Sequence, residues 1–563
     1  MFKYNDIYSI IILLFSISSY AYALLDPPTI ATNERGLVCS PVQLNPKNPL
    51  KSYIKLRTSS LREPEIKDKL KIEALIFHYP DIVNFTSIPT LEEYTTLYPK
   101  DKESLYKKML TDDDKFDLTA ESGFEVDKSK IYEGDLTTTT EDIIYQIPQS
   151  GIYCVYIAPI FKNKQDEKLS LNFKVPIVFK NYYGNLAYPI YLVYSQLKYT
   201  IVVSIIMFIV LFNYILRFKI GENFKNLNSI SVISKGVLFL ILAPFIVICI
   251  YNGFVFWLIN SFLETDEKSF IITVLLFISE TAEFIYSNFR SYIVLLFSMG
   301  FGVIYYYNGN SQNYRLFPQD SFRKITALLF FNIGLVIFTN LLNYLFPTTK
   351  NEIFGMFANV GSSSTTLPFN GKDKKTNFML LLNTLVSLFQ LCWFILSIVF
   401  YFKTKKTIAT FPSSSDFDSN AKVTSAFNKS FFVIMILPII TAIVGASISG
   451  YFAVQNFDKF PDFPQNTNRE PVYQSAITVM ILENALGKFI MPLVYSGLFY
   501  FFCLILSIFF IWIKDNNGLI YCEDDPVAYA DVSNFNISDD EDYRDSPNTD
   551  ENETQDEEEH GRV

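Results

Sequence analysis

Residues 236–259 read GVLFLILAPFIVICIYNGFVFWLI and contain no charged side chain. A helix needs about 20 consecutive apolar residues to cross the ~30 Å hydrocarbon core of a bilayer, where every backbone polar group must be satisfied within the protein. The chain has further apolar stretches of this kind, and we place them at 197–216, 270–306, 325–346, 378–402, 431–454 and 486–513. The sequence therefore predicts a membrane α-helical bundle of seven transmembrane helices over residues 197–513.

The third apolar stretch, 270–306, leaves two interpretations open. It fits one long helix that projects beyond the bilayer, or two helices joined by a tight turn. An odd number of spans puts more lysine and arginine into the loops on the cytoplasmic side, as the positive-inside rule requires, so seven spans are retained. Proline inside a helix removes a hydrogen bond, so Pro244, Pro438 and Pro492 predict kinks.

The start of the chain is typical of a secretory signal peptide over residues 1–23. Lys3 gives it a positive beginning, residues 7–17 are apolar but too short to span a bilayer, and residues 21–23 read AYA, which suits signal peptidase. The alternative is an uncleaved membrane anchor. Either reading places the following segment in the lumen of the secretory pathway.

Residues 24–196 are expected to form an all-β lumenal domain. Runs such as 169–175 (LSLNFKV) alternate apolar and polar residues, which is typical of an antiparallel sandwich, while residues 98–130 predict an inserted helix or loop. This segment contains two cysteines, Cys39 and Cys154, which an oxidising lumen would join in a disulfide. The alternative is a pair of free buried thiols.

The end of the chain, residues 514–563, is expected to be a solvated, disordered cytoplasmic tail. From Asp515 onward it has 17 acidic and 2 basic residues, a charge of −15, so the rest of the chain carries +5 of the net charge of −10. Two short patterns suggest regulation. Tyr529 and Val532 fit a tyrosine-based sorting signal, and Ser538 precedes an acidic run and is a possible phosphorylation site. An acidic tail without either function is the alternative.

Composition argues against several classes of protein. The chain has two histidines, His78 and His560, which makes a histidine-based zinc site or a Ser-His-Asp triad improbable. It has no basic stripe with interleaved aromatic residues, so nucleic-acid binding is not expected. We therefore expect no catalytic residues, no metal and no cofactor, and we do not expect an enzyme.

Four motifs, in order along the chain, resemble those of the lung seven-transmembrane receptor-like proteins, also called GOLD-domain seven-helix proteins. The first is NYYGNL at 181–186 with Pro189, and the second combines residues 282–291 with SMGFGV at 298–303. The third and fourth are the exit of the fifth helix and the WIKDNN stretch at 512–517. The residues that carry the resemblance are Gly184, Leu186, Pro189, Gly300, Gly302, Trp393, Trp512, Asn516 and Asn517.

The sequence is most similar to divergent fungal members of that family and departs from the pattern at two places. Tyr305-Tyr306 and Asp515 stand where other residues are usual. The resemblance implies a GOLD-like β-sandwich on a seven-helix bundle in Golgi or endosomal membranes, with a role in membrane traffic. The implied partners are the lipid bilayer, a lumenal protein cargo or ligand, and cytoplasmic sorting machinery.

Charged residues inside the third apolar stretch are the candidates for a functional site. Glu280, Glu283 and Arg290 lie within about three helical turns, on nearly one face. Such groups cost about 2.5–3.5 kcal/mol at the centre of a membrane helix on insertion scales, so they suggest function. They could line a polar cavity, or Glu283 and Arg290 could form a buried ion pair.

Two other functions compete with membrane traffic. A G-protein-coupled type of receptor is weakened because the third helix lacks an Asp-Arg-Tyr or Glu-Arg-Tyr motif and the seventh lacks Asn-Pro-x-x-Tyr. An ion or lipid pathway through the bundle remains open because of the intramembrane charges. The identity of the cargo and the oligomeric state are not encoded in any motif.

We predict that Asn84, in the sequon Asn84-Phe85-Thr86, is the only glycosylated asparagine. The sequons at Asn428, Asn536 and Asn552 lie on the opposite side of the membrane in this topology. The Asn84→Gln variant should therefore lose the whole mobility shift that glycosidase removes from the wild-type protein on a gel. A shift that persists in this variant would contradict the topology.

Overall fold

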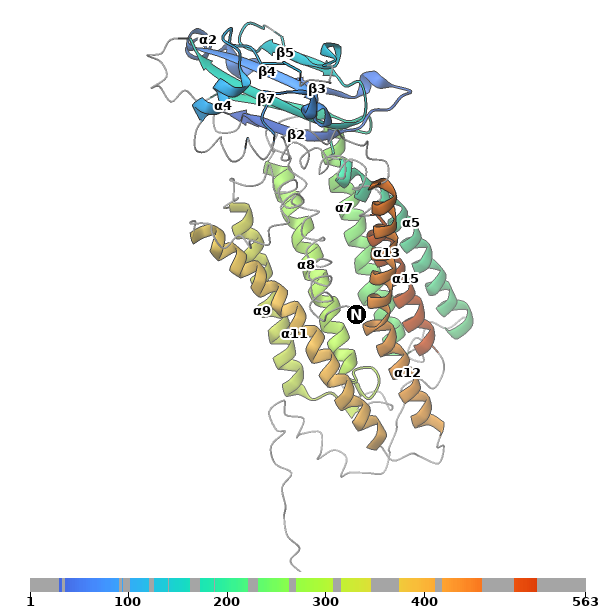
Figure 1. The fold of residues 1–563 in the computed structure, drawn as a ribbon. Helices are drawn as coiled ribbons and strands as arrows, with labels where there is room; N and C mark the ends of the chain where they lie inside the picture. The colour runs from blue at the N-terminus through green and yellow to red at the C-terminus, as the bar shows by residue number, and fades with distance from the viewer. Residues whose placement is uncertain are drawn as a thin grey trace, which may run out of the picture.

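The computed structural model separates a β-domain from a helical bundle, with the β-domain at the end of the bundle where α5 begins (Figure 1). The predicted fold class is confirmed: an N-terminal region of antiparallel sheets precedes seven long apolar helices. The structure describes residues 30–32, 36–90, 94, 102–120, 126–139, 141–162, 173–186, 188–220, 231–262, 270–306, 315–345, 374–410, 418–457 and 491–513. The proposed signal peptide and the acidic tail lie outside these residues.

The β-domain has two four-stranded antiparallel sheets. The first sheet has the order β1 (Ile30–Thr32), β8 (Lys174–Lys180), β3 (Tyr53–Leu56) and β6 (Ile143–Gln146). The second has the order β2 (Leu37–Val42), β7 (Gly151–Phe161), β4 (Leu70–His78) and β5 (Tyr132–Asp135). Apolar side chains from both sheets, such as Val38, Val155 and Ile177, form one core between them, which is the arrangement of a sandwich.

The second sheet is buried on both faces. Its outer face is covered by the segment after β4, which includes η3 (Tyr79–Asn84) and α4 (Lys102–Met109). Phe85 and Leu105 from this segment pack over Phe77 and Tyr156 of the sheet. A strand that is buried on both faces has a continuous apolar sequence, which explains why β7 is buried from Gly151 to Ala158 and does not alternate.

The predicted disulfide is present and joins the edge strand β2 of this sheet to its neighbour β7. Cys39 of β2 lies directly opposite Cys154 of β7, with a Cα–Cα distance of 4.1 Å. Both cysteines belong to the apolar cluster under the inserted segment. The bond therefore links the beginning and the end of the β-domain inside its core.

The seven candidate membrane spans agree with the sequence prediction in number and order. They are Ile190–Arg217, Val232–Phe262, Phe270–Ser298, Gln319–Leu342, Thr384–Thr410, Ala421–Phe452 and Met491–Trp512. The helices that contain them are α5 (Tyr188–Tyr214) with η6 (Ile215–Ile220), α6 (Val232–Gly236) with η8 (Val237–Leu242) and α7 (Ala243–Phe262), α8 (Phe270–Ser298), α9 (Gln319–Leu345), α11 (Lys374–Thr410), α12 (Asp418–Met435) with α13 (Leu437–Phe457), and α15 (Met491–Trp512).

The open question about 270–306 is settled in favour of one helix. The helix α8 ends at Ser298, and Gly300 and Gly302 follow it with φ angles of 89° and 77°. This left-handed conformation favours glycine and ends helices. The two glycines therefore end the span and turn the chain.

Two of the three prolines interrupt their spans as predicted. The second span contains a π-helical segment, Val237–Leu242, which ends two residues before Pro244. The sixth span breaks at Ile436, between α12 and α13 and two residues before Pro438. Pro492 is the second residue of the described part of α15, so the kink expected there lies at the edge of the described residues.

The helix α8 lies at the centre of the bundle's contacts. It packs against α7, α9 and α11, while α15 packs against α12, α13 and the second span, and α5 packs against α7. Figure 1 shows α8 running from the β-domain toward the far end of the bundle. Polar residues on α8 therefore face helices on several sides.

Loss of the disulfide should destabilise the β-domain. We expect the Cys39→Ser/Cys154→Ser variant to lose about 3–5 kcal/mol of stability, because the bond closes a 115-residue loop in the unfolded chain. Thermal unfolding measures the loss, and peptide mapping without reductant identifies the bond. Cys392→Ser, at an exposed free cysteine, is the control and should leave stability unchanged. Free thiols at 39 and 154 in the mapped wild-type protein would contradict the assignment.

Candidate functional site

The first candidate site is the joint between the β-domain and the bundle, which starts at Asn181 directly after β8. The Gln43 N–H donates to Asn181 Oδ1 at 2.7 Å, and Asn181 Nδ2 donates to the Leu186 carbonyl at 3.0 Å. Asn181 is buried. Its side chain thus ties the chain that leaves the β-domain to the end of β2 and to the approach of α5.

Asn260, near the end of α7, holds the same segment from the side of the bundle. Its Nδ2 donates to the Tyr183 carbonyl at 2.7 Å, and its Oδ1 accepts from the Leu186 N–H at 3.2 Å. Its backbone carbonyl accepts from the N–H and the Nδ2 of Asn185, both at 3.3 Å. The last carbonyls of a helix lack hydrogen-bond partners within the helix. Asn185 supplies such a partner for the Asn260 carbonyl near the end of α7.

Gly184 is required at the centre of the joint. Its φ angle is 139°, and a Cβ atom at this position would overlap the Asn260 amide. Leu186 is buried against Val255 and Ile259 of α7, while Pro189 is the second residue of α5, where proline suits the first turn of a helix. The segment 181–186 and Pro189 therefore lie where the two domains meet.

The second candidate site is a polar cluster between α7 and α8. Asn252 of α7 donates from Nδ2 to Glu283 Oε1, and Ser279 Oγ donates to Asn252 Oδ1 at 2.6 Å. Asn252 and Ser279 are buried, and Glu283 is half-buried. An amide that bonds a carboxylate lowers the cost of placing the carboxylate in a membrane.

Arg290 lies on the same face of α8, two turns beyond Glu283. Its guanidinium lies over the Tyr286 ring, 5.2 Å from the ring centroid, and the Tyr286 hydroxyl donates to the Ile241 carbonyl at 2.8 Å. Within the described part of the chain, no ion pair joins Glu283 to Arg290. The hypothesis of a buried Glu283–Arg290 pair is therefore not supported by the geometry. Glu280 is half-buried on the adjacent turn of α8.

Another face of α8 carries a cluster of amides that sequence analysis missed. Asn288 Oδ1 accepts from Asn332 Nδ2 of α9 and from Gln390 Nε2 of α11, each at 2.7 Å. Asn288 Nδ2 donates to the Phe284 carbonyl at 3.0 Å. Asn332 and Gln390 are isolated polar residues in apolar stretches, so only the fold shows that three helices meet there. Hydrogen bonds of this kind hold membrane helices together.

The remaining family residues are placed in cores or lie outside the described residues. Trp512 and Trp393 are buried, and Trp512 Nε1 donates to Ser430 Oγ at 2.7 Å. Both tryptophans therefore serve packing in the half of the bundle that lies away from the β-domain. Asn516, Asn517, Tyr529, Val532 and Ser538 lie outside the residues that the structure describes.

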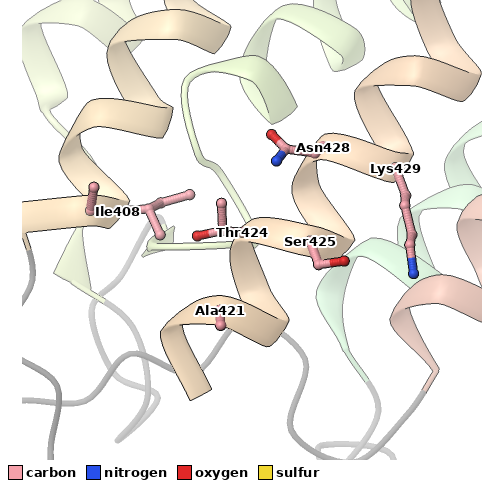
Figure 2. Close-up of a pocket in the computed structure, with 7 residues that line it drawn as sticks. Ile408, Ala421, Thr424, Ser425, Asn428 and Lys429 are labelled. Atoms are coloured by element: carbon pink, nitrogen blue, oxygen red, sulfur yellow. The ribbon is translucent and has the colours of Figure 1, made fainter. Parts of the chain in front are cut away.

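An open hollow of about 510 Å³ lies where α11 ends and α12 begins (Figure 2). It is lined by Ile408, Ala409, Ala421, Thr424, Ser425, Asn428 and Lys429. In Figure 2, Ile408 points toward Thr424, whereas Lys429 extends along another side of α12. The polar groups do not converge on one point, and we assign no ligand to this hollow.

The β-domain contains a buried carboxyl group, Glu73, which is 3% exposed. Burial raises its pKa, although the Lys71 ammonium at 2.9 Å favours the charged form and so opposes the rise. A carboxyl group whose pKa is raised on folding stabilises the fold more as the pH falls through that pKa. Ionised Glu73 thus costs the folded β-domain stability, and this cost disappears as the pH falls through its raised pKa.

No known protein-family profile matches the chain, and no curated protein matches it. The class of protein rests on its own structure. Seven helices long and apolar enough to span a bilayer, with apolar side chains such as Val247, Ile443 and Phe499 exposed on their surfaces, define a multi-pass membrane protein.

Gly184→Ala should weaken the joint. The new methyl group would displace the Asn260 amide and would strain the backbone, and we expect a loss of about 1–3 kcal/mol. Limited proteolysis near residues 181–187, compared with the wild-type protein, measures the opening of the joint. Gly236→Ala, where a Cβ meets no atom within 4 Å, is the control. Equal cleavage of Gly184→Ala and the wild type would show that the joint is not tightly closed.

Proposed function

We propose that this protein acts in membrane traffic in the Golgi and endosomal system, as a member of the GOLD-domain seven-helix family. In this proposal the β-domain faces the lumen and binds a protein cargo or partner, and the acidic tail contacts cytoplasmic sorting machinery. The observation that carries the proposal is the hydrogen-bonded joint of residues 181–186 with Asn260, which fixes a separate β-domain to a seven-helix bundle.

The joint supports this function because it gives the β-domain a fixed position on the membrane part. A binding domain on a flexible linker would keep its partner near the membrane without fixing the partner's position. Here, hydrogen bonds and the buried Leu186 hold the domain against α7. A partner on the β-domain therefore has a defined position relative to the bundle, which suits a cargo receptor whose opposite end faces sorting proteins.

The charges at the far end of the bundle support the orientation. Exposed basic residues lie near the ends of α9, α11 and α12 that are away from the β-domain: Arg323, Lys324, Lys405, Lys406, Lys422 and Lys429. Lysine and arginine are enriched on the cytoplasmic side of membrane proteins. This distribution supports a lumenal β-domain and a cytoplasmic acidic tail.

A second candidate function, an ion or lipid pathway through the bundle, is favoured by one observation. Glu283, Asn252 and Ser279 form a hydrogen-bonded polar cluster between α7 and α8, within the apolar spans. The same cluster would suit a receptor whose helices rearrange when a ligand binds. Conductance across a planar bilayer that holds the purified protein distinguishes a pathway from a traffic receptor.

Deleting residues 523–563 tests the traffic function. We expect the wild-type protein to reside in Golgi or endosomal membranes and the shortened chain to move to another compartment, as seen by imaging of a tagged chain. Tyr529→Ala/Val532→Ala is a narrower variant that should reproduce part of the shift if these residues form the sorting signal. Unchanged localisation of the shortened chain would contradict a sorting role of the tail.

A further inference from the structure

His78 is the last residue of β4 and lies at the end of that strand nearest the joint. In the second sheet it is opposite Tyr153 of β7, close to the place where Gly151 pairs with the last residue of β2. The residue after β2, Gln43, donates to Asn181 of the joint. His78 is 8% exposed, so its ring is enclosed by the protein a short distance from the joint.

The Nδ1 atom of His78 contacts Gln149, which lies in the turn between β6 and β7. The distance from Gln149 Nε2 to His78 Nδ1 is 3.0 Å. An amide nitrogen donates and does not accept, so Nδ1 is the acceptor here and carries no proton. The Tyr153 hydroxyl donates to the Gln149 carbonyl at 2.9 Å. His78 and Tyr153 therefore hold the turn together, one through its side chain and the other through its backbone.

A carboxylate faces the same ring nitrogen. Asp81 Oδ2, in η3, lies 3.9 Å from His78 Nδ1, and the Asp81 side chain is 44% exposed. Two phenols complete the surroundings: Tyr153 of β7, whose ring centroid is 5.3 Å from that of His78, and Tyr145 of β6, which packs against Tyr153. Burial and the charge of Asp81 raise the pKa of Tyr145 to about 12. Both phenol hydroxyls donate to backbone carbonyls and are neutral, so Asp81 is the group beside the ring that suits an imidazolium.

The turn that contains Gln149 is bonded to the strand end that supports the joint. Ser150 Oγ accepts from the Leu44 N–H at 2.9 Å. The neighbouring residue, Gln43, donates to the joint through its N–H, and its carbonyl accepts from the Tyr182 N–H at 3.3 Å. A movement of Gln149 therefore passes through Ser150 and the end of β2 to the joint.

We propose that His78 is a pH switch that controls the joint between the β-domain and the bundle. Histidine is the side chain that ordinarily changes its charge between pH 5 and 8. Once Nδ1 takes a proton from the medium, it no longer accepts from Gln149 Nε2, and its new N–H donates to Asp81 in a charge-assisted hydrogen bond. The turn loses a bond, and the joint opens more readily in an acidic medium than in a neutral one. This inference does not depend on the role in traffic.

Limited proteolysis of the full chain near residues 181–187, at about pH 7.5 and about pH 5.5, tests the switch. The reference is His78→Asn, which keeps an acceptor near the position of Nδ1 and cannot be protonated. The two chains are compared at the same pH, so the pH dependence of the protease cancels. We expect equal cleavage at the higher pH. At the lower pH the wild type should be cleaved about threefold to tenfold faster, which is the change in open population that one hydrogen bond controls.

Two further variants test the parts of the switch. His560→Asn changes the other histidine of the chain and should behave as the wild type does at both pH values. Asp81→Asn removes the carboxylate that receives the new N–H, and it should bring cleavage at the lower pH close to that of His78→Asn. An acid-induced increase in Asp81→Asn as large as in the wild type would overturn Asp81 as the acceptor.

The wild-type chain also tests the switch without any substitution. In NMR spectra of histidine-labelled protein, His78 gives one of two imidazole signals, and its ring should become protonated between pH 5 and 8. A His78 ring that keeps the same charge across this range would overturn the switch. Equal or slower cleavage of the wild type at the lower pH, compared with a His78→Asn variant of the same melting temperature at neutral pH, would overturn the coupling to the joint.

Discussion

The bundle depends on one constraint: a polar group within the hydrocarbon zone needs a partner inside the protein. The helix α8 meets it on more than one side. Toward α7, Asn252 binds Glu283 and Ser279, and toward α9 and α11, Asn288 joins two further amides. These bonds determine which helices surround α8, because apolar packing alone distinguishes membrane helices poorly from lipid. Arg290 follows a different pattern, since its described contact is an aromatic ring.

The β-domain is stabilised differently, by apolar cores that it builds outside the membrane. A two-sheet sandwich leaves its outer faces open to water. Here the segment that includes α4 covers one of them, and the Cys39–Cys154 bond lies beneath it. The domain therefore has two apolar layers instead of one. The covered sheet contains the long strands β4 and β7, which gives the domain a rigid centre.

The sequence predicted the features that depend on local composition. Long apolar stretches predicted the seven helices, and the pair of lumenal cysteines predicted the disulfide. It could not predict features that depend on contacts between distant segments. Asn252, Asn332 and Gln390 are amide residues within apolar stretches, and their sequence positions do not indicate their partners. The packing of four helices shows that they bind residues of α8. The number of helices within 270–306 could not be predicted for another reason. Gly300 and Gly302 follow the end of α8 with left-handed backbone angles, and composition does not reveal such angles.

The helix α7 connects the two candidate sites. Asn260 holds the joint below the β-domain, and Asn252, eight residues earlier on the same helix, holds Glu283 of α8. Eight residues correspond to about 12 Å along a helix and to directions about 80° apart around its axis. A shift of α7 that breaks the bond from Asn260 to Tyr183 therefore also moves the amide that satisfies Glu283. Because a carboxylate in the membrane tolerates the loss of its donor poorly, the position of the β-domain and the polar interior of the bundle are linked through a single helix.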